Sequence, residues 1–411
     1  MNELFTVVPP AEALELLLEH CASIRRFESV LLGDGLGRVN AQVLHAPETL
    51  PAFARSTMDG FAVRAADTFG ASESSPAYLR LCGEVAMGTA ATLTVGAFEA
   101  GRIHTGAMLP GGADAVIMVE DTNAHGDEIE LLASVAPGEN IVSVGEDVRR
   151  GDVALAAGRR LRAQDLGGLA ALGLTQFDVV ERPRIAILST GDEVVAPGAM
   201  AALGQVRDVN ATTIAAVVLA SGGEAKAYGI VPDDEATLLE AMRSALARAD
   251  ALVLSAGSSV SDRDLTARAI ERLGSPGILV HGIAIKPGKP TLIAVADGKP
   301  VIGLPGNPAS ALVLAWRIVA PLVRRLGGEQ SGAGATGGEV EAILTAPVRS
   351  RPGREDYLPC TLERVDGRLC ATPIFGKSNL IFTLVRCDGL ITVPLDRSGI
   401  GADATVRVIV P

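Results

Sequence analysis

The sequence is poor in aromatic residues and has no excess of basic ones. Phe, Trp and Tyr make up 3% of the 411 residues, and 36 Lys and Arg stand against 48 Asp and Glu, a formal net charge of −12. Proteins that bind nucleic acid without regard to sequence generally need stacking rings and a basic groove, so we expect no nucleic-acid partner. A small anionic ligand is still allowed, because a few Lys, Arg and backbone N–H groups can make one pocket positive.

Paired cysteines and long apolar runs are also missing. The five cysteines are scattered and include no C-x-x-C pair, so neither a disulfide framework nor a structural zinc site is expected. The longest apolar stretch, residues 309–323, is short for a bilayer and contains Arg317. The first residues lack the basic and apolar regions of a secretory signal. We therefore expect a cytoplasmic protein without a membrane partner.

Changes in the residue pattern along the chain predict four domains and a mixed α/β plus β fold. Residues 181–328 alternate strand-length apolar runs with helix-length stretches, which is typical of a doubly wound parallel α/β sheet. Residues 51–144 show short β-rich runs between turns and are expected to be a β-rich insertion. The insertion divides a first domain, with a helical N-terminal segment, into residues 1–50 and 145–180. After a Gly-rich linker, residues 339–411 fit a small β-barrel.

Two polar loops of the expected α/β sheet are acidic. In such sheets ligands bind beyond the carboxyl ends of the strands, so loops at these ends are expected to meet. In the first loop Gly191 allows a tight turn, and Asp192 and Glu193 supply oxygen ligands for a hydrated divalent cation. The second loop is Ser-rich and carries Asp262 and Asp264. The ordinary alternatives are an acidic surface turn and a helix cap.

Two further loops favour an anion. Lys286 and Lys289 belong to a Lys-Pro-Gly-Lys-Pro run, in which the prolines stiffen a cationic corner. Residues 303–310 (Gly-Leu-Pro-Gly-Asn-Pro-Ala-Ser) lead into a helix expected at 309–326, whose first N–H groups are unpaired and can bind an anion. Each loop alone could be an unrelated turn. Together, the four loops predict a pocket for a phosphate ester with Mg²⁺.

Three segments outside the α/β region, at 53–61, 105–114 and 145–148, have polar residues that no helical or strand periodicity explains. They overlap a set of seven ordered runs, which span residues 50–62, 105–110, 112–120, 145–147, 189–193, 286–290 and 303–310. These runs resemble the molybdopterin molybdenumtransferase family of the MoeA type, which is related to the E domain of gephyrin. The resemblance therefore covers nearly the whole chain.

The resemblance implies the last step of molybdenum cofactor synthesis. Adenylylated molybdopterin and molybdate would become molybdenum-molybdopterin and AMP, with Mg²⁺ as cofactor. It also implies a homodimer of four-domain subunits, with a MogA-like α/β domain that holds the pterin substrate. The β-rich insertion of one subunit would act as a lid over the site of the other. Other proteins of cofactor synthesis are further candidate partners.

The same resemblance assigns roles to residues. Six are expected to be catalytic: two from the lid, two that handle cation and phosphate, and two lysines that bind phosphate or the incoming oxyanion. In that order they are Asp59 and Thr105, Glu193 and Asp264, and Lys286 and Lys289. The expected metal ligands are Asp192, Glu193, Asp262 and Asp264. The expected substrate-binding residues are Ser56, Asp147, Ser189, Thr190, Gly191, Asp192, Asp208, Gly257, Ser258, Ser259, Pro305, Gly306, Asn307 and Ser378.

The chain departs from the family pattern in three places. Ala256 and Ser261 replace the outer glycines of Gly-Gly-Val-Ser-Val-Gly. Asp-Val-Asn at 208–210 replaces Asp-Ser-Asn, and Gly-Lys-Ser-Asn at 376–379 stands where the family has a Gly-Ser-Gly turn. These departures leave two other functions open: a pterin-binding scaffold without catalysis, or an enzyme that uses tungstate. A third alternative is an enzyme that adenylylates molybdopterin, since the α/β domain resembles that enzyme too.

Overall fold

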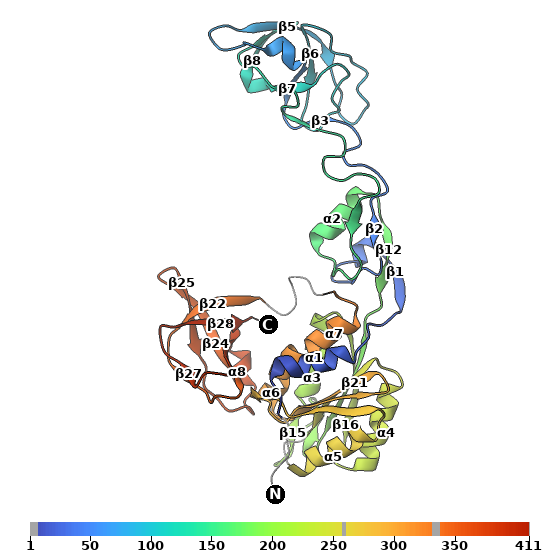
Figure 1. Ribbon diagram of the computed structural model, residues 1–411, viewed down its shortest axis with the longest axis vertical. Helices are drawn as coiled ribbons and strands as arrows, with labels where there is room; N and C mark the ends of the chain where they lie inside the picture. The colour runs from blue at the N-terminus through green and yellow to red at the C-terminus, as the bar shows by residue number, and fades with distance from the viewer. Residues whose placement is uncertain (1–6, 257–259, 331–337, 411) are drawn as a thin grey trace. The chain divides into compact units, whose positions relative to one another are not determined.

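The computed structural model describes residues 7–256, 260–330 and 338–410, and the side chains of all of these except 260–264 (Figure 1). The chain forms two compact units. The first comprises Met1–Gln42, Ala157–Arg162 and Gln176–Pro411, and the second comprises Val43–Ala156 and Ala163–Thr175. The finer division into four domains stays a prediction. No helix among the described residues has the length and apolar character needed to cross a membrane.

A mixed six-stranded sheet forms the core of the first unit. Its order is β16-β13-β17-β21-β20-β18, and the first four strands run parallel. β20 runs antiparallel to both its neighbours. The bounds are β13 (Arg184–Thr190), β16 (Glu224–Val231), β17 (Ala251–Ala256), β18 (Pro276–His281), β20 (Leu292–Ala296) and β21 (Lys299–Pro305). This arrangement confirms the expected α/β fold, but the prediction of a parallel sheet was wrong for β20, which runs opposite to its neighbours.

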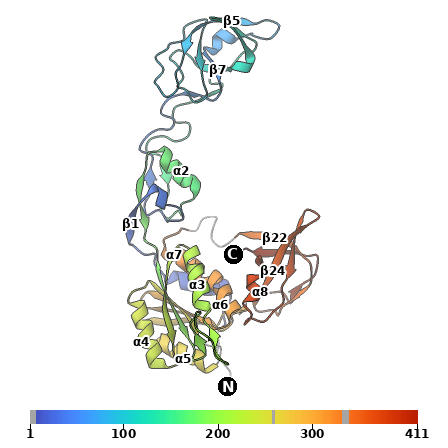
Figure 2. The same ribbon diagram turned by 180° about the vertical axis from the view of Figure 1, so that it is seen from behind.

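Helices cover both faces of this sheet (Figures 1 and 2). Ala186 and Leu188 of β13 pack in the apolar cluster that contains α4 and α5, whereas Ile185 and Ile187 pack in the cluster with the other helices. Both faces are therefore buried, which explains the continuous apolar runs of the strands. One face carries α4 (Glu235–Leu246) and α5 (Val260–Glu271), and the other carries α1 (Pro10–Glu19), α3 (Asn210–Ala220), α6 (Pro308–Leu314) and α7 (Ala320–Leu326). A π-helical segment, Ala315–Val319, joins α6 to α7, so the helix expected at 309–326 has a wide turn at its centre.

The end of the first unit is a closed five-stranded barrel, as expected. The ring runs β24-β25-β22-β28-β26 and is closed by pairing between β26 and β24. A short strand from the α/β part, β19 (Ile285–Lys286), adds to the barrel sheet parallel to β24. The bounds are β22 (Glu339–Leu344), β23 (Val348–Arg349), β24 (Glu355–Val365), β25 (Arg368–Pro373), α8 (Phe382–Val385), β26 (Gly389–Val393), β27 (Gly399–Ile400) and β28 (Thr405–Ile409).

Shorter elements complete the first unit. β1 (Phe27–Leu31) pairs antiparallel with β12 (Gln176–Val180), and β14 (Val194–Val195) pairs parallel with β15 (Val206–Arg207). Arg26, next to β1, donates two hydrogen bonds to Asp250 at 2.8 and 3.0 Å. This bidentate ion pair attaches the β1 segment to the start of β17.

The second unit is built on a six-stranded sheet in the order β7-β4-β6-β5-β9-β8. Gly60, at the start of β4, lies so close to its neighbour strand that an added Cβ would be 1.9 Å from the carbonyl oxygen of Ile117. The segment Met-Asp-Gly at 58–60 therefore needs glycine at its last position. The bounds are β2 (Leu44–His45), β3 (Arg55–Ser56), β4 (Gly60–Val63), β5 (Ala77–Glu84), β6 (Glu99–Ile103), β7 (Ala115–Met118), β8 (Thr122–His125), β9 (Glu128–Leu131), β10 (Ile141–Val142), β11 (Val153–Leu155) and α2 (Ala163–Ala171).

Candidate functional site

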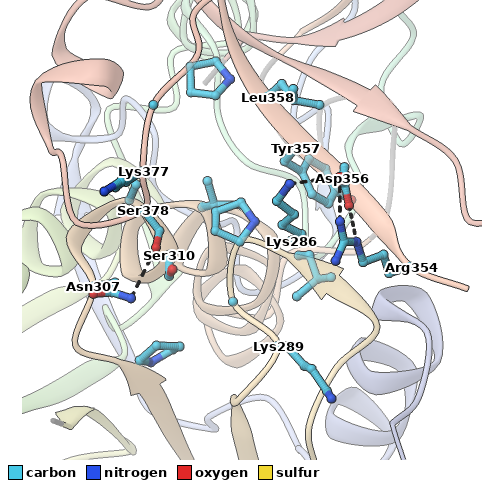
Figure 3. A pocket seen from close by; sticks show the side chains of 18 of the residues that line it. Lys286, Lys289, Asn307, Ser310, Arg354, Asp356, Tyr357, Leu358, Lys377 and Ser378 are labelled. Atoms are coloured by element: carbon cyan, nitrogen blue, oxygen red, sulfur yellow. Dashed lines mark hydrogen bonds and ion pairs between the residues drawn. The ribbon is translucent and has the colours of Figure 1, made fainter. Parts of the chain in front are cut away.

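A pocket of about 1370 Å³ lies in the first unit, between the loops around α6 and the barrel (Figure 3). One wall comes from the Lys-Pro-Gly-Lys-Pro loop at 286–290 and from residues at the start of α6. The other wall comes from residues 349, 351–354, 356–359 and 374–379, in and around the barrel. Five of the expected site residues line it: Lys286, Lys289, Pro305, Asn307 and Ser378.

The lining of this pocket is strongly basic. Within the described residues it contains six basic side chains and one acidic side chain, Asp356. The basic residues are Lys286, Lys289, Arg349, Arg351, Arg354 and Lys377. A protein with a formal charge of −12 thus has a pocket whose local charge is positive. This is the arrangement that can attract a small anion to an acidic protein.

The loop that carries the two lysines is packed tightly against α6. Gly288 has a φ of +120°, and an added Cβ would be 2.6 Å from Cδ1 of Leu314. Thr291 donates a hydrogen bond to the Gly288 carbonyl at 2.7 Å. Figure 3 shows Lys286 directed toward Asp356 and Lys289 leaving the same loop in another direction. Glycine therefore fixes the loop from which both ammonium groups extend.

Asp356 on β24 joins cations from two parts of the chain. Its Oδ1 accepts a hydrogen bond from Arg354 Nε at 2.8 Å, and its Oδ2 accepts one from Arg354 Nη2 at 3.3 Å. Lys286 Nζ lies 3.7 Å from Oδ2. Sequence reasoning missed Arg354 and Asp356. The run Arg-Ser-Arg-Pro-Gly-Arg at 349–354, which places three basic residues in one loop, could have drawn attention to Arg354, whereas no local signal marks Asp356.

The turn at Ser378 contacts the loop before α6. Asn307 Nδ2 donates to Ser378 Oγ at 3.2 Å, and Ala309 N donates to the Ser378 carbonyl at 3.0 Å. One of the helix-start N–H groups expected to bind an anion is therefore used in holding the barrel turn. Ser310, in the first turn of α6, is buried and also lines the pocket.

A second set of expected residues gathers at the carboxyl edge of the α/β sheet. Ser189 and Thr190 end β13 and are buried, and the Ser189 Oγ has no hydrogen-bond partner in the described part of the chain. Asp192 and Glu193 follow and are exposed. The Asp192 N–H donates to the Asp233 carboxylate at 3.4 Å, and the Asp233 N–H donates to the Asp192 carboxylate at 3.3 Å. These reciprocal bonds hold the acidic loop beside the end of β16.

Asn210, which sequence reasoning did not select, connects three loops of this edge. Its Nδ2 donates to Ser255 Oγ at 2.7 Å and to the Gly306 carbonyl at 2.9 Å. Its Oδ1 is buried without a partner among the described residues. Asp208 accepts a hydrogen bond from the N–H of Ala211 at 3.0 Å, so this expected substrate ligand supports the first turn of α3.

Several expected residues cannot be assigned a position in either group. Gly257, Ser258 and Ser259 lie outside the described residues, as do the side chains of Asp262 and Asp264. Among the side chains that are described, no three His, Cys, Asp or Glu cluster in a way that could hold a metal ion. Asp192 and Glu193 are the members of the expected metal set whose side chains are placed.

In the second unit, Asp59 and Thr105 are in direct contact. The Thr105 N–H donates to Asp59 Oδ1 at 2.8 Å, and the Thr105 hydroxyl, Oγ1, donates to the same oxygen at 3.3 Å. The backbone hydrogen bond from Thr105 lowers the pKa of Asp59, so the carboxylate stays ionised at neutral pH. His104 lies between Asp59 and Glu84, at 3.5 and 3.0 Å. Ser56 is buried and donates to the Met58 carbonyl at 2.6 Å, and Asp147 is exposed.

Comparisons with known proteins cover nearly the whole chain. Residues 8–173 match the MoeA N-terminal region (domain I and II), residues 186–325 a probable molybdopterin binding domain, and residues 341–410 the MoeA C-terminal region (domain IV). A molybdopterin molybdenumtransferase of Nostoc sp. is 33% identical over 93% of this chain and 88% of its own length. One of Bacillus subtilis is 30% identical over 100% of this chain and 95% of its own. The crystal structure of a molybdopterin biosynthesis MoeA protein from Pyrococcus horikoshii superposes with a TM-score of 0.86 at 31% identity, covering 99% of this chain and 100% of that one.

Proposed function

The chain belongs to the MoeA family of molybdopterin molybdenumtransferases, and we propose that it inserts molybdate into adenylylated molybdopterin with release of AMP. It is thus a transferase of molybdenum cofactor biosynthesis. The observation that carries the proposal is the basic pocket, in which six cationic side chains line a cavity of about 1370 Å³ in an acidic protein. Homologous molybdenumtransferases align over nearly the full chain and support the same reaction.

The chemistry of the two substrates explains the pocket. Molybdate is a tetrahedral dianion, and the adenylylated pterin carries a pyrophosphate. Lys286 and Arg354 supply cationic N–H donors, which bind oxyanions with short, strong hydrogen bonds. Lys289, from the same loop as Lys286, can stabilise the negative charge that develops when the pyrophosphate is cleaved. The basic residues can thus act by neutralising charge, without a covalent intermediate on the protein.

The edge of the sheet supplies a different kind of contact, which suits the pterin part of the substrate. The Ser189 Oγ and the Asn210 Oδ1 are buried and unpartnered in the described part of the chain. A buried polar atom without a partner is costly, so a ligand that hydrogen-bonds to it gains binding energy. We therefore assign the polar groups of the pterin substrate to this edge and the incoming oxyanion to the basic pocket.

Mg²⁺ is proposed as the cofactor at the acidic loop. Mg²⁺ usually keeps several waters and is held by one or two carboxylates together with substrate phosphates. Asp192 and Glu193 are exposed carboxylates at the carboxyl end of β13, a donor set that fits such an ion. When bound, the ion would neutralise phosphate oxygens. Asp262 and Asp264 belong to the same proposal through the family resemblance alone.

Asp59 and Thr105 are proposed to act from the lid of a partner subunit. This requires a homodimer, which we propose together with a cytoplasmic location. The ionised Asp59 carboxylate is held by two groups of Thr105, so its orientation is fixed before substrate arrives. Asp59 can then orient a substrate group without first giving up a proton.

The test is release of AMP by the purified protein from adenylylated molybdopterin. We expect release with molybdate and Mg²⁺ together, and little when either is omitted. Replacing molybdate by tungstate shows whether tungstate is the preferred oxyanion. Tight pterin binding with no AMP under any metal condition would contradict the proposal and identify a scaffold. Consumption of ATP with free molybdopterin would identify an adenylylating enzyme instead.

A further inference from the structure

Asp356 is a buried carboxylate in a pocket whose other charged lining residues are all basic. It is 1% exposed, whereas the side chains of Arg354 and Lys286 are 30% and 56% exposed. We propose that Asp356 is a positioning residue, which fixes the Arg354 guanidinium and the Lys286 ammonium in the relative geometry that binds the tetrahedral oxyanion. This inference rests on the proposed function and adds to it a residue that does not itself touch the substrate.

The contacts show how one carboxylate can orient both cations. Arg354 Nε and Nη2 bind the two oxygens of Asp356 in a fork, and Lys286 Nζ lies near the second oxygen. The fork uses two of the five guanidinium N–H donors, so three remain for a ligand. Arg and Lys side chains lose much rotamer freedom when they bind, and a fixed partner removes part of that loss in advance.

The backbone supports the same arrangement. Lys286 and Asp356 are register partners in the parallel pair β19 and β24, although they are far apart in the sequence. β19 is the strand that leads into the lysine loop, and β24 belongs to the closed barrel. Asp356 therefore sits on a rigid strand between the two walls of the pocket. A carboxylate in this place ties the cation of one wall to the cation of the other.

The alternative is that Asp356 is only a counter-ion, which lowers the positive charge of the pocket. The two roles predict opposite effects when the charge is removed. If Asp356 is a counter-ion, the Asp356→Asn variant binds molybdate more tightly, because the pocket gains one net positive charge. If Asp356 positions Arg354 and Lys286, the same variant binds molybdate more weakly, because the fork and the ion pair are lost.

The experiment compares Asp356→Asn with Glu355→Gln. Glu355 is the adjacent acid, and its carboxylate accepts a hydrogen bond from Tyr357 Oη at 2.6 Å. We expect the molybdate KM of Asp356→Asn to rise about tenfold or more, as loss of a charged hydrogen bond does. The KM of adenylylated molybdopterin and the kcat at saturating molybdate are expected to stay within about twofold. Glu355→Gln should match the wild type in all three.

Two further measurements keep the inference separate from the proposed reaction. The first is equilibrium dialysis of molybdate with the free protein. The molybdate Kd of Asp356→Asn should exceed that of the wild type by the same factor as the molybdate KM does. The dialysis decides the role of Asp356 even if the wild type releases no AMP, which would contradict the proposed function alone. If Asp356→Asn does not fold, Arg354→Lys is the second variant, since it keeps the charge but loses the fork. An unchanged or lower molybdate Kd in the folded variant, or no molybdate binding by the wild type, would overturn the inference.

Discussion

The basic pocket and the carboxyl edge of the sheet solve the problem of binding a polar substrate in opposite ways. The pocket uses long cationic side chains, and two of them, Lys286 and Arg354, are partly exposed and are held by one buried carboxylate, Asp356. At the edge, the two side chains that we assign to the pterin, Ser189 and Asn210, are short and uncharged, and they are buried and positioned by the ends of strands and helices. A long side chain needs a fixed partner, whereas a short one takes its position from the backbone. The comparison predicts that the two regions fail differently when altered.

Loss of a pocket cation should have the largest effect. Replacing Lys286 by Met keeps most of the side-chain volume and removes the ammonium group. We expect kcat/KM for molybdate to fall about 100-fold, since a charge-assisted contact and the partner of a buried carboxylate are both lost. The measurement is AMP release at saturating adenylylated molybdopterin and varied molybdate.

The matched control for that variant is Lys226→Met. Lys226 lies on β16, exposed and 5.3 Å from the centre of the Tyr228 ring, and the substitution makes the same charge change outside the pocket. Its kcat/KM should remain near that of the wild type. An equal loss in both variants would show that net charge, and not the place of Lys286, controls molybdate binding.

Loss of an edge residue should affect the other substrate. Asn210→Ala removes the bonds to Ser255 Oγ and to the Gly306 carbonyl. We expect a stability loss of about 2 kcal/mol from the groups left unpaired. The KM of adenylylated molybdopterin should rise about tenfold because the substrate also loses its acceptor, Oδ1. Urea unfolding and AMP release at varied pterin substrate measure the two effects.

The Asn210→Ala variant tests whether the edge binds the pterin substrate and the pocket binds molybdate. The molybdate KM of Asn210→Ala should stay within about twofold, in contrast to that of Asp356→Asn. Asn123→Ala, which removes a side-chain bond to Glu130 in the second unit, serves as a control for the loss of an exposed amide. A rise of both KM values in Asn210→Ala would mean that the edge and the pocket form one site without separate tasks.

The edge of the sheet could be predicted from the sequence more completely than the pocket, for a physical reason. Strands buried on both faces are continuous apolar runs, so the α/β sheet and the loops at its carboxyl edge could be predicted from local pattern. The pocket depends on the pairing of β19 with β24, which brings Lys286 to Asp356 across a long stretch of sequence. No local pattern encodes that register, so the lysines were predicted and Arg354 and Asp356 were not. Asp208 was expected to bind substrate from the family resemblance, but its carboxylate accepts a hydrogen bond from Ala211 N in the first turn of α3.

A change of ionic strength should distinguish the pocket from the edge, and its expected effect is the smallest of those predicted here. Raising NaCl from about 0.05 to 0.5 M shortens the range over which charges act from above 10 Å to below 5 Å, so the molybdate KM should increase about threefold. NaCl is preferred to a sulfate salt, because sulfate is itself a tetrahedral dianion. The effect of Asn210→Ala relative to the wild type should be the same at both salt concentrations, since the lost groups are uncharged. For Asp356→Asn the ratio of molybdate KM values should change with salt, since that variant alters the charges that hold the oxyanion. A salt-dependent ratio in Asn210→Ala would instead show that the contact made by Asn210 also depends on charge.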